Sequence, residues 1–200
     1  MTSIAKKRVL EVAAEMFGER GYHGVSMRHL ADALEMQAQS LYAHVPSKQH
    51  LLLELCAAGI AEHRKRVMAA VLEAGSDPVD QMRALVGAHV LAHLDHPSLG
   101  RIASREAHHL EPELLARVTA MRDQSAALFL EIVDRGARLG AFTVEHPRRA
   151  MRAIADMGIR LAEHDVAPDE HDEIVEDYVT FALHMLAPTV PGAARVRQAS

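Results

Sequence analysis

Apolar residues recur at steps of three and four along nearly the whole chain, which is the spacing of one face of an α-helix. Prolines, glycines and short capping residues interrupt this pattern. Together they predict nine helices, at about residues 3–20, 27–34, 37–45, 48–74, 78–96, 98–109, 112–138, 147–164 and 169–185. Because no segment alternates polar and apolar residues between turns, as a strand does, the pattern predicts an all-α chain.

The first three predicted helices are short and lie close together. Gly21 follows the first helix as a left-handed cap, Ser26 caps the second, and Pro46 ends the third before Ser47 caps a long fourth helix. Three short helices with a tight turn describe a helix-turn-helix unit. We therefore expect a DNA-binding domain over residues 1–50, a second helical domain over 51–186 and a tail over 187–200.

Composition and charge narrow the class of protein. The 200 residues carry a net charge of −5, which argues against a protein that coats nucleic acid through bulk charge. Residues 1–50 are nevertheless close to neutral, with six Lys/Arg against five Asp/Glu, so a local DNA site is compatible with the charge. Cys56 is the single cysteine, which excludes an intramolecular disulfide. No apolar run reaches the roughly 20 residues of a membrane span, and the start lacks a secretion signal, so we expect a cytoplasmic protein without a membrane partner.

Two runs of sequence carry a family likeness. They read AAEMFGERGYHGVSMRHLA over residues 13–31 and SLYAHVPSKQHLL over residues 40–52. Both resemble the N-terminal signature of TetR-family transcriptional regulators, in which an aromatic residue and Glu-Arg-Gly end the first helix and Leu-Tyr-x-His-Phe-x-Ser-Lys leads into the fourth. The resemblance covers about residues 4–52. It implies a DNA-binding regulator that is not an enzyme, and a repressor released from its operator by a small-molecule effector.

The resemblance also implies that the third helix enters the major groove. Gln37 and Gln39 are the expected base readers, because a glutamine amide matches the adenine edge. Tyr42 and Lys48 correspond to phosphate contacts of the family, and Ser26 offers free first-turn amides to a phosphate. The full expected set of DNA contacts is Ser26, Arg28, Gln37, Ala38, Gln39, Ser40, Tyr42, His44 and Lys48. Plain solvation is the alternative for each of these surface residues.

Three positions depart from the family pattern. Glu35 stands where the turn before the third helix usually has glycine, so it must bear roughly 1 kcal/mol of left-handed strain or open a different turn. Gln37 replaces the usual Ser or Thr cap, and Val45 replaces a larger phenylalanine. The docking angle and the operator sequence are therefore expected to differ within the family.

The family dimerises through its last two helices, and the sequence is compatible with this. The apolar stripe of the eighth predicted helix comprises Met151, Ile154, Ala155, Gly158, Leu161 and Ala162. The last helix has a wider stripe than one core face needs, made of Ile174, Val175, Tyr178, Phe181, Ala182, Met185 and Leu186. The alternative is a face buried within a monomer. A two-fold dimer predicts a palindromic operator.

By the same resemblance, the C-terminal helices enclose an effector pocket, and the effector shifts the fourth helix. The expected pocket residues are Met82, Leu85, Val86, His89, His93, His108, Met121, Phe129 and Met157, with ordinary core as the alternative for each apolar one. The stretch around Arg101 and Arg105, with Arg122 further on, is similar to acyl-CoA-responsive members. A hydrophobic or acyl-CoA-like effector is therefore expected, and no cofactor is required.

Histidine is unusually frequent, with 14 residues, five of which fall between positions 89 and 109. His89 and His93 are four residues apart, so one helical face presents both rings, while His108 and His109 end the next predicted helix. Imidazole is a preferred ligand of zinc and nickel, so these four histidines define a candidate metal site. The alternatives are a polar pocket wall or surface histidines. A His-rich metal-binding protein or a metal-responsive regulator is accordingly the alternative function.

Overall fold

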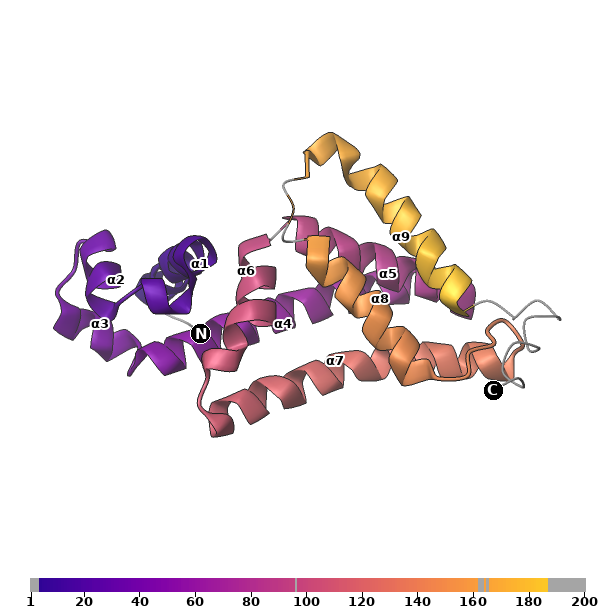
Figure 1. Cartoon of the computed structure of the whole chain (residues 1–200), viewed down its shortest axis with the longest axis horizontal. Coiled ribbons are helices and arrows are strands. Elements are labelled where there is room, and N and C mark those ends of the chain that lie inside the picture. The colour runs from indigo at the N-terminus through magenta and orange to yellow at the C-terminus, as the bar shows by residue number, and fades with distance from the viewer. Residues whose placement is uncertain (1–3, 96, 162–163, 165, 187–200) are drawn as a thin grey trace, which may run out of the picture.

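The computed structural model describes residues 4–95, 97–161, 164 and 166–186, and within these ranges it contains nine α-helices and no strand (Figure 1). The predicted all-α class is confirmed. The predicted tail at 187–200, and Ala162 of the predicted dimer stripe, lie outside the described residues. The α-helices are α1 (Ile4–Gly24), α2 (Met27–Ala33), α3 (Ala38–His44), α4 (Lys48–Glu73), α5 (Pro78–Asp95), α6 (Pro97–Arg101), α7 (Pro112–Arg138), α8 (Pro147–Leu161) and α9 (His171–Leu186). None of these described helices combines the length and the apolar character that crossing a bilayer requires.

Helices α1 to α3 and the start of α4 form the N-terminal unit at one end of the molecule (Figure 1). Phe17, Leu41 and Val45 are almost completely buried in its core. The predicted caps are confirmed, since the hydroxyl of Ser26 accepts the His29 N–H at 3.1 Å and that of Ser47 accepts the His50 N–H at 3.2 Å. Each cap satisfies a first-turn amide and so fixes where its helix begins.

The predicted turn anomalies are also present. Gly21 has a φ of 70° and ψ of 168°, a conformation that favours glycine, although α1 resumes beyond this kink and runs to Gly24. Glu35 has a φ of 54°, and it is the one non-glycine residue with positive φ in the described part of the chain. Gln37 precedes α3 without a side-chain cap, as its amide predicts. The turn before α3 thus keeps a left-handed residue although glycine is absent.

Helix α4 continues from the N-terminal unit into the second unit, so the predicted boundary at residue 50 falls inside a continuous helix (Figure 1). In the second unit α5 lies centrally and packs against α4, α7, α8 and α9. Val67 of α4, Val90 of α5 and Ile132 of α7 belong to its buried core. One continuous helix thus spans both units.

The stretch predicted as one helix over residues 98–109 is broken instead. It consists of α6, a π-helical turn η1 (Ile102–Glu106) and a 3₁₀ turn η2 (Ala107–His109). Ser104 donates its hydroxyl to the carbonyls of Gly100 at 2.8 Å and Arg101 at 3.3 Å, and so competes with backbone amides for them. Such π turns occur frequently at functional sites.

The predicted dimer stripe of α8 is mostly internal. Ile154, Gly158 and Leu161 are buried within the protomer, where α8 packs against α5. Helix α9 differs, because Phe181 and Met185 remain 48% and 37% exposed. The large apolar side chains of the two predicted stripes that remain exposed are therefore on α9.

Candidate functional site

The outer face of α3 is the first candidate site, and it is open to solvent. Leu41 is completely buried and anchors the helix, while its neighbour Tyr42 is 49% exposed. The predicted contacts Gln37, Ala38, Gln39, Ser40 and Tyr42 are exposed, and His44 is partly buried at the end of the helix. The predicted residues on and just before α3 are thus accessible from solvent, His44 only in part.

The predicted contacts outside α3 differ in how freely they can reach a ligand. Arg28 of α2 is exposed, whereas the hydroxyl of Ser26 is already used in capping α2. Lys48 begins α4, and its Nζ lies 4.0 Å from the ring centroid of Tyr22, a cation–π contact. Partial burial lowers the pKa of Lys48 and raises that of Tyr22. The Lys48 side chain is therefore held in a defined position at the start of α4.

Hydrogen bonds join the N-terminal unit to the start of α7, in a group that we call the interdomain joint: Tyr22, Gln49, Glu106, His109 and Glu111. Glu106 Oε2 accepts the Tyr22 backbone N–H at 2.7 Å. Gln49 Nε2 donates to the Tyr22 hydroxyl at 3.1 Å and to the His109 carbonyl at 2.9 Å, and Gln49 Oε1 accepts the Glu111 N–H at 3.0 Å. Residues far apart in sequence thus lock the N-terminal unit to η1 and η2.

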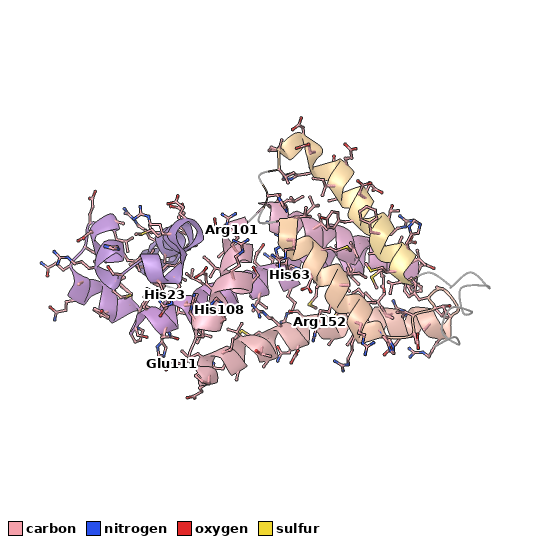
Figure 2. The ribbon with its side chains drawn as sticks, viewed as in Figure 1. His23, His63, Arg101, His108, Glu111 and Arg152 are labelled. Carbon is pink, nitrogen blue, oxygen red and sulfur yellow. The ribbon has the colours of Figure 1, made fainter. Side chains whose placement is uncertain are left out.

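His108 and His109 lie at this joint, which corrects two predictions. The His109 ring stacks on Tyr22 and lies 3.2 Å, nitrogen to nitrogen, from His23, while His108 is exposed beside it (Figure 2). Burial lowers the pKa of His109, and the neighbouring His108 lowers it further. His108 does not line the cavity described next, and neither His108 nor His109 joins His89 and His93. The 3₁₀ turn η2 that follows η1 directs the rings of His108 and His109 away from His89 and His93. The sequence spacing of histidines within one predicted helix does not show this.

A cavity of about 780 Å³ lies between α4, α5, η1, α7 and α8. Leu85, Phe129 and Ile154 give it an apolar floor. Its other lining residues include Gly59, Ile60, Glu62, His63, Arg66, His89, His93, Ala103, Ser104, Arg105, Arg122, Asp123, Met151, Arg152, Asp156 and Arg160. A cavity of this size suits a small organic ligand.

Four predicted pocket residues line this cavity, namely Leu85, His89, His93 and Phe129. The other predicted pocket residues do not line this cavity. Met82 and Val86 are buried in the core of the second unit. Met121 does not line the cavity, and Met157 packs against the second core.

Arginine side chains give the cavity a cationic mouth. Two of them, Arg105 and Arg122, were predicted from the sequence, but Arg152 was not. Arg105, Arg122 and Arg152 line the cavity and are exposed, and Arg122 also donates to the Ala103 carbonyl. Figure 2 labels Arg152 on α8. Arg66 lies deeper and pairs with Asp95 at 2.7 Å and with Glu62 at 3.2 Å. An anionic group on a ligand would find complementary charge at this mouth.

Three imidazoles meet in the cavity wall. His63 Nε2 lies 2.7 Å from His89 Nδ1, and the rings of His89 and His93 are 4.8 Å apart between centroids. Burial lowers the pKa of all three to about 4, and their mutual repulsion adds to this effect. The three rings are therefore neutral at pH 7. His63 was absent from the prediction, because no periodicity links a residue of α4 to residues of α5.

Two protein-family models match the chain. A model described as "Bacterial regulatory proteins, tetR family" matches residues 9–55. A second, described as "Tetracyclin repressor-like, C-terminal domain", matches residues 75–186, which is more than half of the chain. Both units of the structure are thus covered by family models.

The chain is similar to individual proteins as well. It is 27% identical over 179 residues to the HTH-type transcriptional activator FasR of Mycolicibacterium smegmatis, covering 88% of this chain and 80% of that protein. The crystal structure of a tetR-family regulatory protein from Rhodococcus RHA1 superposes with a TM-score of 0.88 at 27% identity, covering 94% of this chain and 100% of the other. AibR, solved in complex with isovaleryl coenzyme A and operator DNA, has the same fold, with a TM-score of 0.80 at 22% identity over 88% of this chain and 97% of that one. These matches favour the regulator over the alternative of a His-rich metal-binding protein.

Proposed function

Since the chain belongs to the TetR family of DNA-binding transcriptional regulators, we propose that it works as a homodimeric repressor. A small-molecule effector then releases it from a palindromic operator. The observation that carries the proposal is the placement of the cavity. Its walls include α4 and η1, the same two elements that hold the N-terminal unit through the interdomain joint.

On the DNA side, the proposal rests on the free surface of α3. Gln37 and Gln39 read base edges in the major groove, and Tyr42 and Lys48 hold phosphates on either side. Ser26, Arg28, Ala38, Ser40 and His44 complete the contact surface. Exposure of α3 on a well-buried Leu41 anchor supports this assignment.

A dimer is part of the proposal, because one helix-turn-helix unit makes few contacts. Phe181 and Met185 on α9 offer an apolar surface that a second copy would cover. Two copies related by a two-fold axis would place two α3 helices about one turn of DNA apart, roughly 34 Å. The operator would then be an inverted repeat.

The chemistry of the cavity favours an effector with an apolar body and an anionic group. Leu85 and Phe129 would take the apolar part, while Arg105, Arg122 and Arg152 would meet a carboxylate or phosphates. An acyl-coenzyme A or a hydrophobic carboxylic acid combines an apolar part with an anionic group in this way. The complex of AibR with isovaleryl coenzyme A adds a precedent in the same fold. The similarity to the transcriptional repressor KstR2 of Mycobacterium tuberculosis supports repression, whereas FasR is named an activator.

A mobility-shift titration tests the proposal, with DNA from the promoter region of the protein's own gene. Tight binding to an inverted repeat, weakening steeply with salt, is expected. Isovaleryl coenzyme A, a long-chain acyl-coenzyme A, the free acids and coenzyme A alone are then added in turn. Release by an acyl-coenzyme A or acid, but not by coenzyme A alone, is the expected result. Sequence-independent binding, or no binding at low salt, would contradict the proposed regulator. A fall in the target transcript after deletion of the gene would show that the protein activates transcription and does not repress it.

We predict that Glu106→Ala uncouples the effector from DNA. Glu106 follows Ser104 and Arg105 of the cavity wall and accepts the Tyr22 backbone N–H, so it links the cavity wall to the N-terminal unit. Coupling energies of this kind correspond to roughly 5- to 150-fold changes in affinity. The acyl-coenzyme A that releases the wild type should bind the variant with unchanged affinity. The drop in operator affinity that it causes should be about 10-fold smaller in the variant than in the wild type.

Calorimetry of effector binding and operator titrations with and without effector measure the two quantities separately. Glu113→Ala is the matched control, because this neighbouring carboxylate in the first turn of α7 is exposed. Equal release of Glu106→Ala and wild type would show that the signal travels through α4 alone.

A further inference from the structure

The histidine cluster formed by His63, His89 and His93 lies in the cavity wall, where α4 and α5 face each other (Figure 2 labels His63). Each residue offers one ring nitrogen, and the three nitrogens lie within 4.8 Å of one another. Among the residues that the structure describes, no other three His, Cys, Asp or Glu side chains form such a group. We propose that the histidine cluster binds one divalent transition-metal ion, with Zn²⁺ as the expected one, and leaves a fourth coordination position open to the cavity. This inference does not depend on which effector the protein takes.

The tautomers follow from the hydrogen bonds. His89 Nε2 lies 3.1 Å from the Ala155 carbonyl, which can only accept, so Nε2 carries the proton. The lone pair of His89 Nδ1 therefore points at His63 Nε2, 2.7 Å away. A backbone carbonyl that fixes the far nitrogen of a histidine is the usual support of a metal ligand. His89 thus already has the orientation and the protonation state of a bound ligand.

His93 gives an independent sign that a ligand is missing. Its Nδ1 is buried and has no hydrogen-bond partner among the described residues. Buried polar atoms normally have a partner, so this nitrogen calls for one. A metal ion between the three rings would take its lone pair.

The distances need only a small adjustment. Two imidazole nitrogens that share a tetrahedral Zn²⁺ at about 2.0–2.1 Å lie ~3.3 Å apart. The 2.7 Å pair would open and the 4.8 Å span would close, each through side-chain rotation. In the 2.7 Å pair, His63 Nε2 donates its proton to the lone pair of His89 Nδ1. When the ion binds between these two nitrogens, the proton of His63 moves from Nε2 to Nδ1.

Helix α8 is shaped to admit the His89 ring. A Cβ on Gly158 would lie 2.3 Å from His89 Nε2, so any larger residue would displace the imidazole. Gly158 therefore serves the histidine cluster and not the dimer contact that its small size predicted. The open fourth position faces the cavity, where a water molecule or an anionic group of a ligand would complete the coordination.

Zn²⁺ binding to the full-length protein tests the proposal, after dialysis against a chelator and in competition with a chromophoric chelator. About one Zn²⁺ per chain is expected. His63→Ala and His93→Ala should each weaken binding by more than the roughly 10- to 100-fold cost of losing a residue that only orients a ligand. His108→Ala is the matched control, since it removes an exposed histidine that lies beside the interdomain joint and outside the histidine cluster, and should bind Zn²⁺ as the wild type does. Equal Zn²⁺ affinity of all three variants, or no competition with the chelator, would overturn the proposal.

X-ray absorption of the Zn²⁺-loaded wild type keeps the test decisive if a variant does not fold. Three imidazole nitrogens at about 2.0 Å would support the site, and one or none would overturn it. Operator binding is measured on the same sample with and without metal. Loss of operator binding by both samples would contradict the proposed regulator while leaving the metal result unaffected.

Discussion

Phe181→Glu is expected to convert the proposed dimer into a monomer and to weaken operator binding by roughly 1,000-fold or more, because one half-site alone keeps little of the specific affinity. The reason lies in the two neighbouring stripes of α9. Val179, Ala182 and Leu186 are buried against the protomer, whereas Phe181 and Met185 are exposed. A carboxylate in the centre of an apolar contact would have to lose its hydration without gaining a partner. Sedimentation equilibrium measures the mass, and operator titration measures the affinity.

Thr180→Glu is the matched control for this prediction. Thr180 precedes Phe181 and is exposed, but it points about 100° away around the helix, toward the polar face. The control should remain a dimer and bind the operator as the wild type does. A Phe181→Glu protein that stays dimeric would place the interface elsewhere and would contradict the assignment to α9.

Local chemistry was sufficient to predict most of the fold. Ser26 and Ser47 cap helices because a hydroxyl can accept a first-turn amide, a rule that needs only neighbours in sequence. The left-handed Glu35 follows from a turn whose geometry the family pattern dictates. The broken helix at η1 could not be predicted, since its apolar spacing is helical and the π turn depends on how Ser104 bonds to the preceding carbonyls.

Contacts between helices were the weaker part of the prediction. Apolar spacing finds a buried face but does not say what covers it, so the α8 stripe around Ile154 and Gly158 was assigned to a dimer although α5 covers it. The histidines show the same limit. His89 and His93 were paired correctly by their spacing, but their third partner, His63, comes from another helix, and only the packing of α4 on α5 brings it near.

Tyr42→Ala and Gln39→Ala are expected to weaken DNA binding in different ways. Tyr42 is proposed to hold a phosphate, so its loss should lower the affinity for all DNA sequences alike. Gln39 is proposed to read a base, and a bidentate contact of this kind discriminates by about 1–3 kcal/mol. Since a dimer carries the change in both half-sites, Gln39→Ala should lose about 2–6 kcal/mol of preference between the operator and a symmetrically altered one.

Competition titrations with the operator, with both half-sites altered at one base pair, and with unrelated DNA separate the two effects. Ala43 is exposed on α3 between Tyr42 and His44 but is not itself a proposed contact, so Ala43→Ser serves as a control for changes that alter the helix surface without removing a proposed contact. Binding measured at several salt concentrations should give the same slope for Gln39→Ala as for the wild type, because no phosphate contact is lost. If Gln39→Ala discriminated between the sites as well as the wild type, base reading would have to pass to Gln37, whose uncapped position before α3 gives its amide the same freedom to reach the groove. The pair of variants thus separates phosphate holding by Tyr42 from base reading by Gln39.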